Sequence, residues 1–187
     1  MQKPQRQTGT LTFRARPPCG HSRVSSLRPL SGGRLRLARL VRLWSMRPLP
    51  NALRRLIESG PMAHLSTINP DGSPQVTVIW IGLEGDEVVS GHLDHHRKLR
   101  NIERDPRVVL SFDGERDHEA VLNPYVVLRA RALVEPSDRA WDLLNRLAKV
   151  YLSPDSEFPA PKRPGYVARY TVERISGIGP WVAEQTA

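Results

Sequence analysis

Apolar and polar residues alternate over several short stretches of the chain, and this alternation is the pattern of half-buried β-strands. Turn residues such as Asn69-Pro70-Asp71-Gly72 separate the stretches. The pattern predicts six strands, at residues 62–68, 75–81, 87–91, 107–112, 125–134 and 166–175. Helical spacing of apolar residues predicts helices at 51–59, 97–105 and 138–151. Short strands joined by tight turns favour a small antiparallel barrel with helices tucked against it.

The same periodicity predicts which side chains face the core. In the helix at 138–151, whose N-cap is expected at Ser137, the apolar stripe consists of Trp141, Leu144, Ala148 and Tyr151. Residues 92–96 are expected to form a polar surface loop, and residues 177–181 an irregular tail. Trp80 and Trp181 fit two interpretations, because a tryptophan in a small barrel either belongs to the core or lines a flat cofactor.

Charge divides the chain into two parts. The 187 residues carry a net charge of +9, but ten of the 28 basic residues and none of the acidic ones lie in residues 1–45. The domain predicted for residues 46–187 is therefore nearly neutral, with 18 basic and 19 acidic residues, which argues against a nucleic-acid partner.

The single cysteine, Cys19, excludes an internal disulfide and a cysteine-based metal cluster. No apolar run approaches the roughly 18 residues that span a bilayer, so we expect no membrane partner. The domain itself contains no cysteine, which fits a cytoplasmic protein.

The basic segment at residues 1–45 admits three interpretations. Arginine-rich, acid-free segments are typical of targeting presequences. They also occur as basic arms that bind nucleic acid or anionic lipid. The third interpretation is an extension that is disordered or wrongly assigned, with the true start at Met46. The abrupt change in composition at Met46 favours this third interpretation.

Candidate chemistry concentrates in residues 90–101, SGHLDHHRKLRN. Here a predicted strand ends and a predicted helix begins with Arg97 and Lys98. The free N–H groups of a helix start, two cations and the Ser90 hydroxyl together fit a phosphate site, although the same cations also fit a solvated helix face. Three histidines and Asp94 in this segment match no established metal-site spacing, so we assign no metal ligand. We also assign no catalytic acid or base.

Three blocks of sequence occur in a familiar order: MAHLSTINPDGSPQVTVIWIGLEGDEVVSG, RKLRNIERDPRVVLSF and YVVLRARALVEP. Together they resemble the pyridoxamine 5'-phosphate oxidase-like superfamily over about residues 50–178. The resemblance implies a six-stranded antiparallel split β-barrel with short flanking helices. It also implies a homodimer whose cofactor lies across the interface between the two copies.

The resemblance further implies roles for named residues. The backbone of Thr77, Val78, Ile79 and Trp80 is expected to run along the cofactor ring, with Arg97 and Lys98 on the cofactor phosphate. FMN-binding oxidases of this superfamily typically carry an arginine on this strand, at about the position of Thr77, so this chain lacks that cation. The run from Lys98 to Pro106 looks more like the branch that uses the deazaflavin coenzyme F-420, which is common in actinobacteria.

An F-420-dependent oxidoreductase that transfers a hydride to a small conjugated substrate is therefore expected. The alternatives are an FMN-dependent enzyme similar to pyridoxamine-phosphate oxidase and a non-catalytic dimer that binds flavin or haem. The second of these stays open because fold alone does not establish activity.

Overall fold

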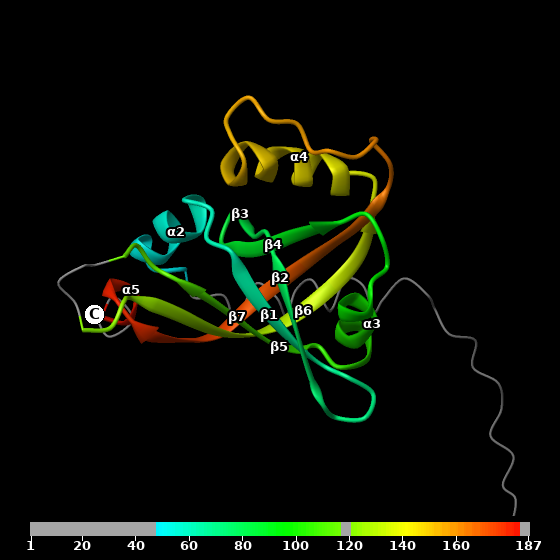
Figure 1. Cartoon of the computed structure of the whole chain (residues 1–187). Helices are drawn as coiled ribbons and strands as arrows, with labels where there is room; N and C mark the ends of the chain where they lie inside the picture. The colour runs from blue at the N-terminus through cyan, green and yellow to red at the C-terminus, as the bar shows by residue number, and fades with distance from the viewer. Residues whose placement is uncertain (1–47, 117–120, 184–187) are drawn as a thin grey trace, which may run out of the picture. The chain divides into compact units, whose positions relative to one another are not determined.

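The computed structural model describes residues 48–116 and 121–183, which form one antiparallel sheet with short helices around it (Figure 1). In chain order the elements are α2 (Asn51–Glu58), β1 (Ala63–Ile68), β2 (Pro74–Ile79), β3 (Gly82–Glu84), β4 (Glu87–His92), α3 (Arg97–Arg104), β5 (Arg107–Asp113), β6 (Tyr125–Ser137), α4 (Ala140–Tyr151), β7 (Gly165–Ile178) and α5 (Pro180–Ala183). The predicted extension at residues 1–45 lies outside the described residues, so the boundary at Met46 stays a prediction. None of the described helices is long and apolar enough to cross a membrane.

The seven strands lie in the order β2-β1-β5-β6-β7-β4-β3, and every neighbouring pair is antiparallel. This arrangement confirms the predicted class, with seven strands in place of six. The predicted strand at 75–81 ends early because the Tyr151 hydroxyl binds the backbone at Ile81. It accepts the Ile81 N–H at 3.0 Å and lies 3.0 Å from the Ile81 carbonyl oxygen. The chain turns there and continues as the short strand β3.

The inner face of the sheet encloses the main core. A continuous apolar row crosses four neighbouring strands of the sheet. Each of its residues is the direct partner of the next, in the order Leu65, Leu110, Leu128 and Ile175. The three leucines are fully buried. Leu53 of α2 and residues of α3 complete this cluster. The period-2 pattern predicts that Leu128 faces inward, whereas the pairing of the four residues depends on the strand order.

Helix α4 covers the opposite, outer face of the sheet over β4 and β7. Leu143 and Leu147 pack there against Val89 and Val167. Gly91 permits the close approach, because a Cβ at this position would lie 2.8 Å from the Leu144 Cγ. Figure 1 shows α4 lying over β4 in this way.

The prediction for α4 was partly wrong. The helix begins at Ala140, since Ser137 is still the last residue of β6 and its hydroxyl accepts the Arg139 N–H at 3.2 Å. The buried stripe consists of Ala140, Leu143, Leu144, Leu147 and Ala148. Trp141 and Tyr151 are only half-buried. Each donates a hydrogen bond to a backbone carbonyl outside the helix, Trp141 to that of Ala160 and Tyr151 to that of Pro61.

The predicted irregular tail was also wrong. Strand β7 continues to Ile178 and is followed by α5, which carries the buried Trp181. Gly177 permits the continuation, because it has a φ of +124° and pairs with Val126. A Cβ at Gly177 would lie 2.1 Å from the Tyr125 carbonyl oxygen. Glycine at this position allows two strands to pair closely, whereas the sequence pattern suggested that the strand ends before it.

Candidate functional site

Polar side chains gather on the inner face at the α3 side of the sheet, whereas the rest of that face is apolar. The strand register places Thr67, Gln75, Thr77, Ser90, His92 and Tyr170 on this face. Asn101 of α3 joins them. We call these seven residues the polar end. A barrel interior that is polar at one end is a common place for a ligand.

The start of α3 leaves backbone donors available. His96 precedes the helix without a side-chain cap, and its carbonyl accepts the N–H groups of Leu99 and Arg100. Among the described residues, the N–H groups of Arg97 and Lys98 have no backbone acceptor. Free N–H groups at a helix start bind anions, so the geometry agrees with the phosphate interpretation.

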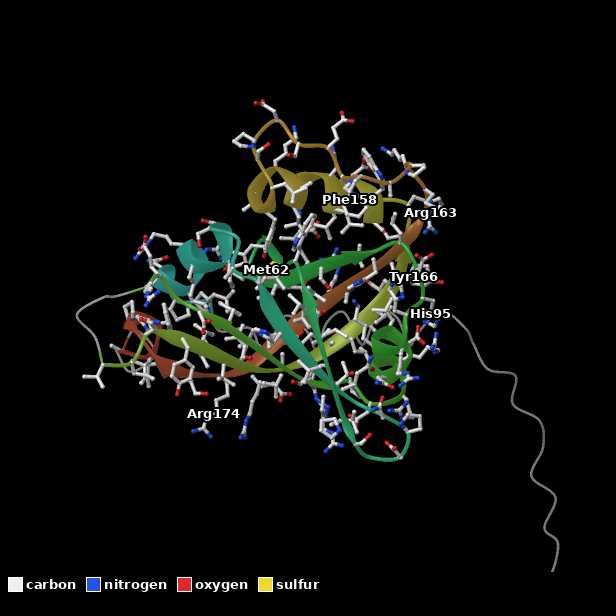
Figure 2. The ribbon with its side chains drawn as sticks, viewed as in Figure 1. Met62, His95, Phe158, Arg163, Tyr166 and Arg174 are labelled. Atoms are coloured by element: carbon white, nitrogen blue, oxygen red, sulfur yellow. The ribbon has the colours of Figure 1, made fainter. Side chains whose placement is uncertain are left out.

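The loop before α3 is held in place by a residue from far along the chain. Arg163 donates to the Leu93 carbonyl at 3.0 Å and to the Asp94 carboxylate at 2.8 Å. The His95 ring lies 4.9 Å from the Tyr166 ring, and its Nε2 pairs with Glu103 at 2.9 Å. Figure 2 shows Arg163, Tyr166 and His95 following one another along this side of the molecule.

The two cations at the helix start differ in their surroundings. The Arg97 side chain is exposed, whereas Lys98 is half-buried. Burial lowers the pKa of the Lys98 ammonium below its ordinary value, because a charge loses hydration there. An anion beside Lys98 would replace the lost hydration, so this residue is the better candidate anchor.

Ser90 and His92 belong to a buried network. The Ser90 Oγ lies 2.8 Å from the His92 Nε2 and 2.8 Å from the Tyr170 hydroxyl. Burial, followed by the charges of Lys98 and His96, lowers the pKa of His92 to about 3, so the ring is neutral at neutral pH. Burial also raises the pKa of Tyr170 above its ordinary value.

This network corrects two expectations. His92 was expected in a polar surface loop, but it is the last residue of β4 and is 6% exposed. Ser90 was expected to donate directly to a phosphate, but its side chain is fully buried and its hydroxyl is engaged within the network. His92 lies inside because β4 is one residue longer than predicted, and Ser90 lies inside because the even-numbered residues of β4 face the core.

Strand β2 lies at the edge of the sheet, so one side of its backbone has no strand partner among the described residues. The Thr77 hydroxyl is buried and also lacks a hydrogen-bond partner in the described parts of the chain. A buried polar atom without a partner is unusual and fits a site that a ligand completes. Val78 is exposed and Ile79 is buried.

The Trp80 side chain points toward α4. Its ring stacks on Tyr151 at 5.1 Å with an interplanar angle of 14°, and Phe158 meets it edge-on at 6.0 Å. Trp181 belongs to the main core instead. The two tryptophans are therefore not brought together to line a flat cofactor, and the core interpretation is the one that the structure supports.

Asn101 is a residue of the candidate site that was not predicted from the sequence. Asn101 is 1% exposed, and its amide nitrogen contacts oxygens of Thr67, Asn69 and Gln75. A signal was present, because Asn101 stands between the inward-facing Leu99 and Ile102, where a buried polar residue needs partners.

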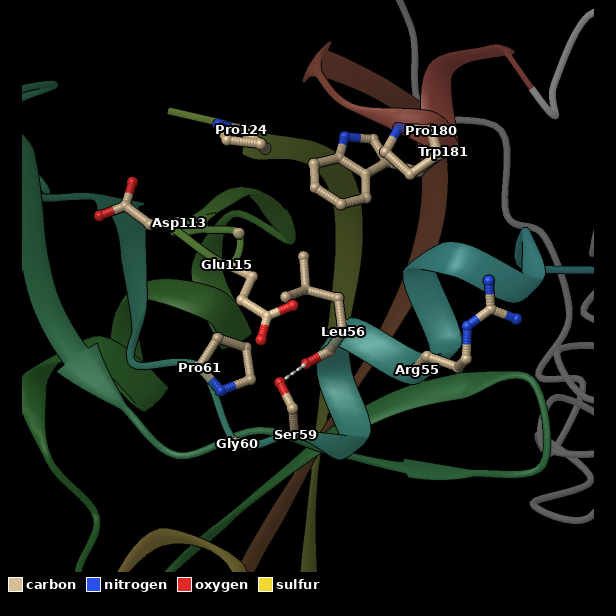
Figure 3. Close-up of a pocket in the computed structure, with 11 residues that line it drawn as sticks. Arg55, Leu56, Ser59, Gly60, Pro61, Asp113, Glu115, Pro124, Pro180 and Trp181 are labelled. Carbon is tan, nitrogen blue, oxygen red and sulfur yellow. Dashed lines mark hydrogen bonds between the residues drawn. The ribbon is translucent and has the colours of Figure 1, made fainter. Parts of the chain in front are cut away.

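A cavity of about 620 Å³ lies away from all of these residues, between α2, the end of β5 and α5 (Figure 3). Its wall includes Leu56, Pro61 and Trp181, and the Glu115 side chain points into it. Trp181 lines this cavity, but none of the residues expected to bind the cofactor, at 77–80, Ser90, Arg97 and Lys98, does so. Within residues 48–116 and 121–183, no group of three or more potential ligand side chains is arranged to hold a metal ion.

Comparisons with known proteins agree with this arrangement. A sequence profile of the family described as pyridoxamine 5'-phosphate oxidase matches residues 49–178. A solved structure described as an F420 reductase is 27% identical, with a TM-score of 0.55 over 68% of this chain and 98% of that chain. No curated protein matches the sequence.

Two further structures show similarity of fold alone. A conserved hypothetical protein of Mycobacterium tuberculosis is 18% identical, with a TM-score of 0.58 over 75% of this chain and 91% of that chain. HupZ of Group A Streptococcus is 16% identical, with a TM-score of 0.52 over 70% of this chain and 94% of that chain.

Proposed function

The chain belongs to the pyridoxamine 5'-phosphate oxidase family, and we propose that it is an oxidoreductase that binds the deazaflavin coenzyme F-420 and acts on a small conjugated substrate. The observation that carries the proposal is the similarity to the F420 reductase structure, which extends over 98% of that chain. When bound, the coenzyme supplies hydride transfer, and the protein supplies binding, orientation and electrostatics.

The residues of the polar end fit such a cofactor. We infer that the start of α3 binds its phosphate through the N–H groups of Arg97 and Lys98 and through the Lys98 ammonium. The free edge of β2 from Thr77 to Ile79, with Trp80 directly after it, offers backbone groups to a flat ring. The Thr77 hydroxyl offers a further hydrogen bond. Ser90, His92 and Tyr170 support the site from within the core, with no direct contact assigned to them.

We further propose that the protein is a homodimer, and the outer face of the sheet supports this. Helix α4 covers this face over β4 and β7, whereas no helix of the described residues covers the same face over β2. Val76 and Val78 on β2 are 58% and 50% exposed there, and the register continues this face to Val109 on β5 and Val127 on β6. A bare face with several valines favours association, and a two-fold pair of identical copies is the commonest solution.

A binding titration tests the cofactor. The full chain is mixed with F-420, FMN or haem, and binding is followed by fluorescence for the first two and by absorbance for haem. We expect the tightest binding with F-420. Tighter binding of FMN would favour the oxidase-like alternative, and binding of haem alone would favour a non-catalytic carrier.

Light scattering at micromolar concentration tests the dimer separately. We expect twice the mass of one chain. A monomer that still binds cofactor would exclude an interface between copies as part of the site.

A further inference from the structure

Asn101 connects α3 to the hairpin formed by β1 and β2. Its amide nitrogen lies 3.1 Å from the Thr67 Oγ1, 3.0 Å from the Asn69 Oδ1 and 2.9 Å from the Gln75 Oε1. These three oxygens come from the end of β1, the turn and the start of β2. One buried side chain therefore contacts both arms of the hairpin and the turn between them.

The orientation of this amide is fixed from the other side. Arg104, one turn later on α3, donates its Nη1–H to the Asn101 Oδ1 at 3.2 Å. A guanidinium only donates hydrogen bonds, so the Asn101 oxygen must face Arg104 and the NH₂ group must face the hairpin. Arg104 also donates to the Ile68 carbonyl at the end of β1. Asn101 and Arg104 thus both bind the hairpin, and Arg104 fixes the orientation of the Asn101 amide.

Helical and strand periodicity relate this contact to the proposed cofactor site. Lys98 precedes Asn101 by three residues, so the two lie on neighbouring positions of one face of α3. Thr77 follows Gln75 by two residues, so the two share the inner face of β2. The hydrogen bond between Asn101 and Gln75 consequently fixes how the Lys98 end of α3 lies relative to the Thr77 segment of β2.

We propose that Asn101 is a positioning residue, which holds the anion-binding start of α3 and the edge strand β2 in the arrangement that a cofactor needs. This inference rests on the proposed function. Apart from the bonds of Asn101 and the bond from Arg104 to the Ile68 carbonyl, the buried contacts of α3 come from Leu99 and Ile102. Their apolar packing is non-directional and does not by itself fix the helix along its axis. Directional hydrogen bonds supply that precision.

Asn101→Ala tests the proposal on the full chain. The ligand is F-420 or FMN, whichever the wild type binds more tightly. We expect the variant to bind it about tenfold more weakly, because the loss of one typical hydrogen bond leaves α3 less well positioned. We also expect Lys98→Ala to weaken binding less in the Asn101→Ala background than in the wild type, because two residues that act through one geometry are not additive. Gln75→Ala, which removes the contact from the strand side, provides the same test if Asn101→Ala folds poorly.

Asn145→Ala is the matched control. Asn145 is a half-buried asparagine of α4, and its Oδ1 accepts the Phe158 N–H at 2.8 Å. Its loss should destabilise the fold without changing cofactor affinity. Amide hydrogen exchange gives a readout that needs no ligand: Asn101→Ala should accelerate exchange in α3 and in residues 69–74 together, and Asn145→Ala in neither.

The outcomes separate the two proposals. If Lys98→Ala weakens binding but Asn101→Ala and Gln75→Ala do not, the positioning role is wrong and the cofactor site stands. If Lys98→Ala has no effect either, the cofactor site itself is wrong, and the positioning role fails with it. Faster exchange in α3 without any change in residues 69–74 would also overturn the positioning role, because it would show that the two elements are not coupled through Asn101.

Discussion

Helices α3 and α4 are attached to the same sheet by different means. Helix α4 packs mainly through apolar area, with Leu143 and Leu147 against Val89 and Val167 on the outer face. Polar contacts are added by two side chains that are not buried, Arg146 with Glu84 and Tyr151 with the Ile81 backbone. Helix α3 places Leu99 and Ile102 in the main core but adds the buried amide of Asn101, which contacts three oxygens of one hairpin. Apolar packing supplies stability without fixing direction, whereas hydrogen bonds fix direction with a small net gain. The comparison agrees with the proposal that α3 belongs to a cofactor site, whereas α4 mainly stabilises the fold.

The largest expected effect concerns the apolar attachment of α4. Leu147→Ala should lower the free energy of unfolding by about 2–5 kcal/mol, because it removes a buried side chain and leaves a cavity over Val89. Cofactor affinity of the folded protein should not change. Chemical denaturation measures the first quantity and fluorescence titration the second. Leu152→Ala, just beyond the helix at an exposed residue, is the control and should have little effect. A loss below 1 kcal/mol for Leu147→Ala would mean that α4 is attached by other contacts.

The opposite result is expected for Lys98 on α3. Lys98→Ala should weaken cofactor binding on the order of ten- to a hundredfold, since a charge-assisted hydrogen bond contributes about 1.5–3 kcal/mol. Unfolding should hardly change, and added salt should weaken binding of the wild type more than of the variant. Lys149→Ala on the exposed side of α4 is the control. Unchanged affinity in Lys98→Ala would return α3 to the interpretation of a solvated charged face.

Acid should act on the α3 side of the molecule through His92. The pKa of this buried ring is lowered to about 3, so the folded state stays neutral while the unfolded state takes up a proton below about pH 6.5. Stability should therefore be highest above pH 6.5 and fall as the pH is lowered toward 3, by about 2 kcal/mol between pH 7.5 and pH 5.

Urea denaturation at the two pH values measures this dependence of stability on pH. His92→Gln should remove most of it, whatever its own cost to stability. His64→Gln, at an exposed position of β1, should retain it. Equal pH dependence in the wild type and His92→Gln would show that His92 is not the group that titrates.

The smallest expected effect lies on the part of the outer face that neither helix covers. Arg129 and Arg174 are direct partners on β6 and β7, both are exposed, and neither has an ion pair within the described residues. A β-bulge next to this pair directs Arg174 outward, and Figure 2 shows its side chain pointing away from the sheet. Like charges on directly opposed residues repel each other.

At low salt, Arg174→Gln should therefore raise the free energy of unfolding by a few tenths of a kcal/mol, which is measured as a slightly higher thermal midpoint. The gain should disappear at high salt. Arg131→Gln is the control, because Arg131 is paired with Glu173 at 3.2 Å and should show no gain. A gain that persists at high salt would point to a cause other than repulsion.

The sequence alone determined the regular parts of this protein. Alternation of period two located the strands and placed Leu128 on an inward face, because this depends on neighbouring residues alone. Helical spacing located α3, and the pair of cations at its start was visible in the sequence as a candidate anion site. The order of the sequence blocks indicated the family that the profile match to residues 49–178 establishes.

Only the tertiary structure decided how the polar residues are used. Ser90 was assigned to a phosphate site and His92 to a polar loop, because local pattern does not reveal that Tyr170, eighty residues after Ser90, meets the Ser90 hydroxyl in the interior. Asn101 was missed because its partners are 26 to 34 residues away on another element. Periodicity reports which face a side chain occupies, since this depends on neighbouring residues alone. Which distant polar groups meet on that face depends on how the sheet closes, and no local pattern contains that information.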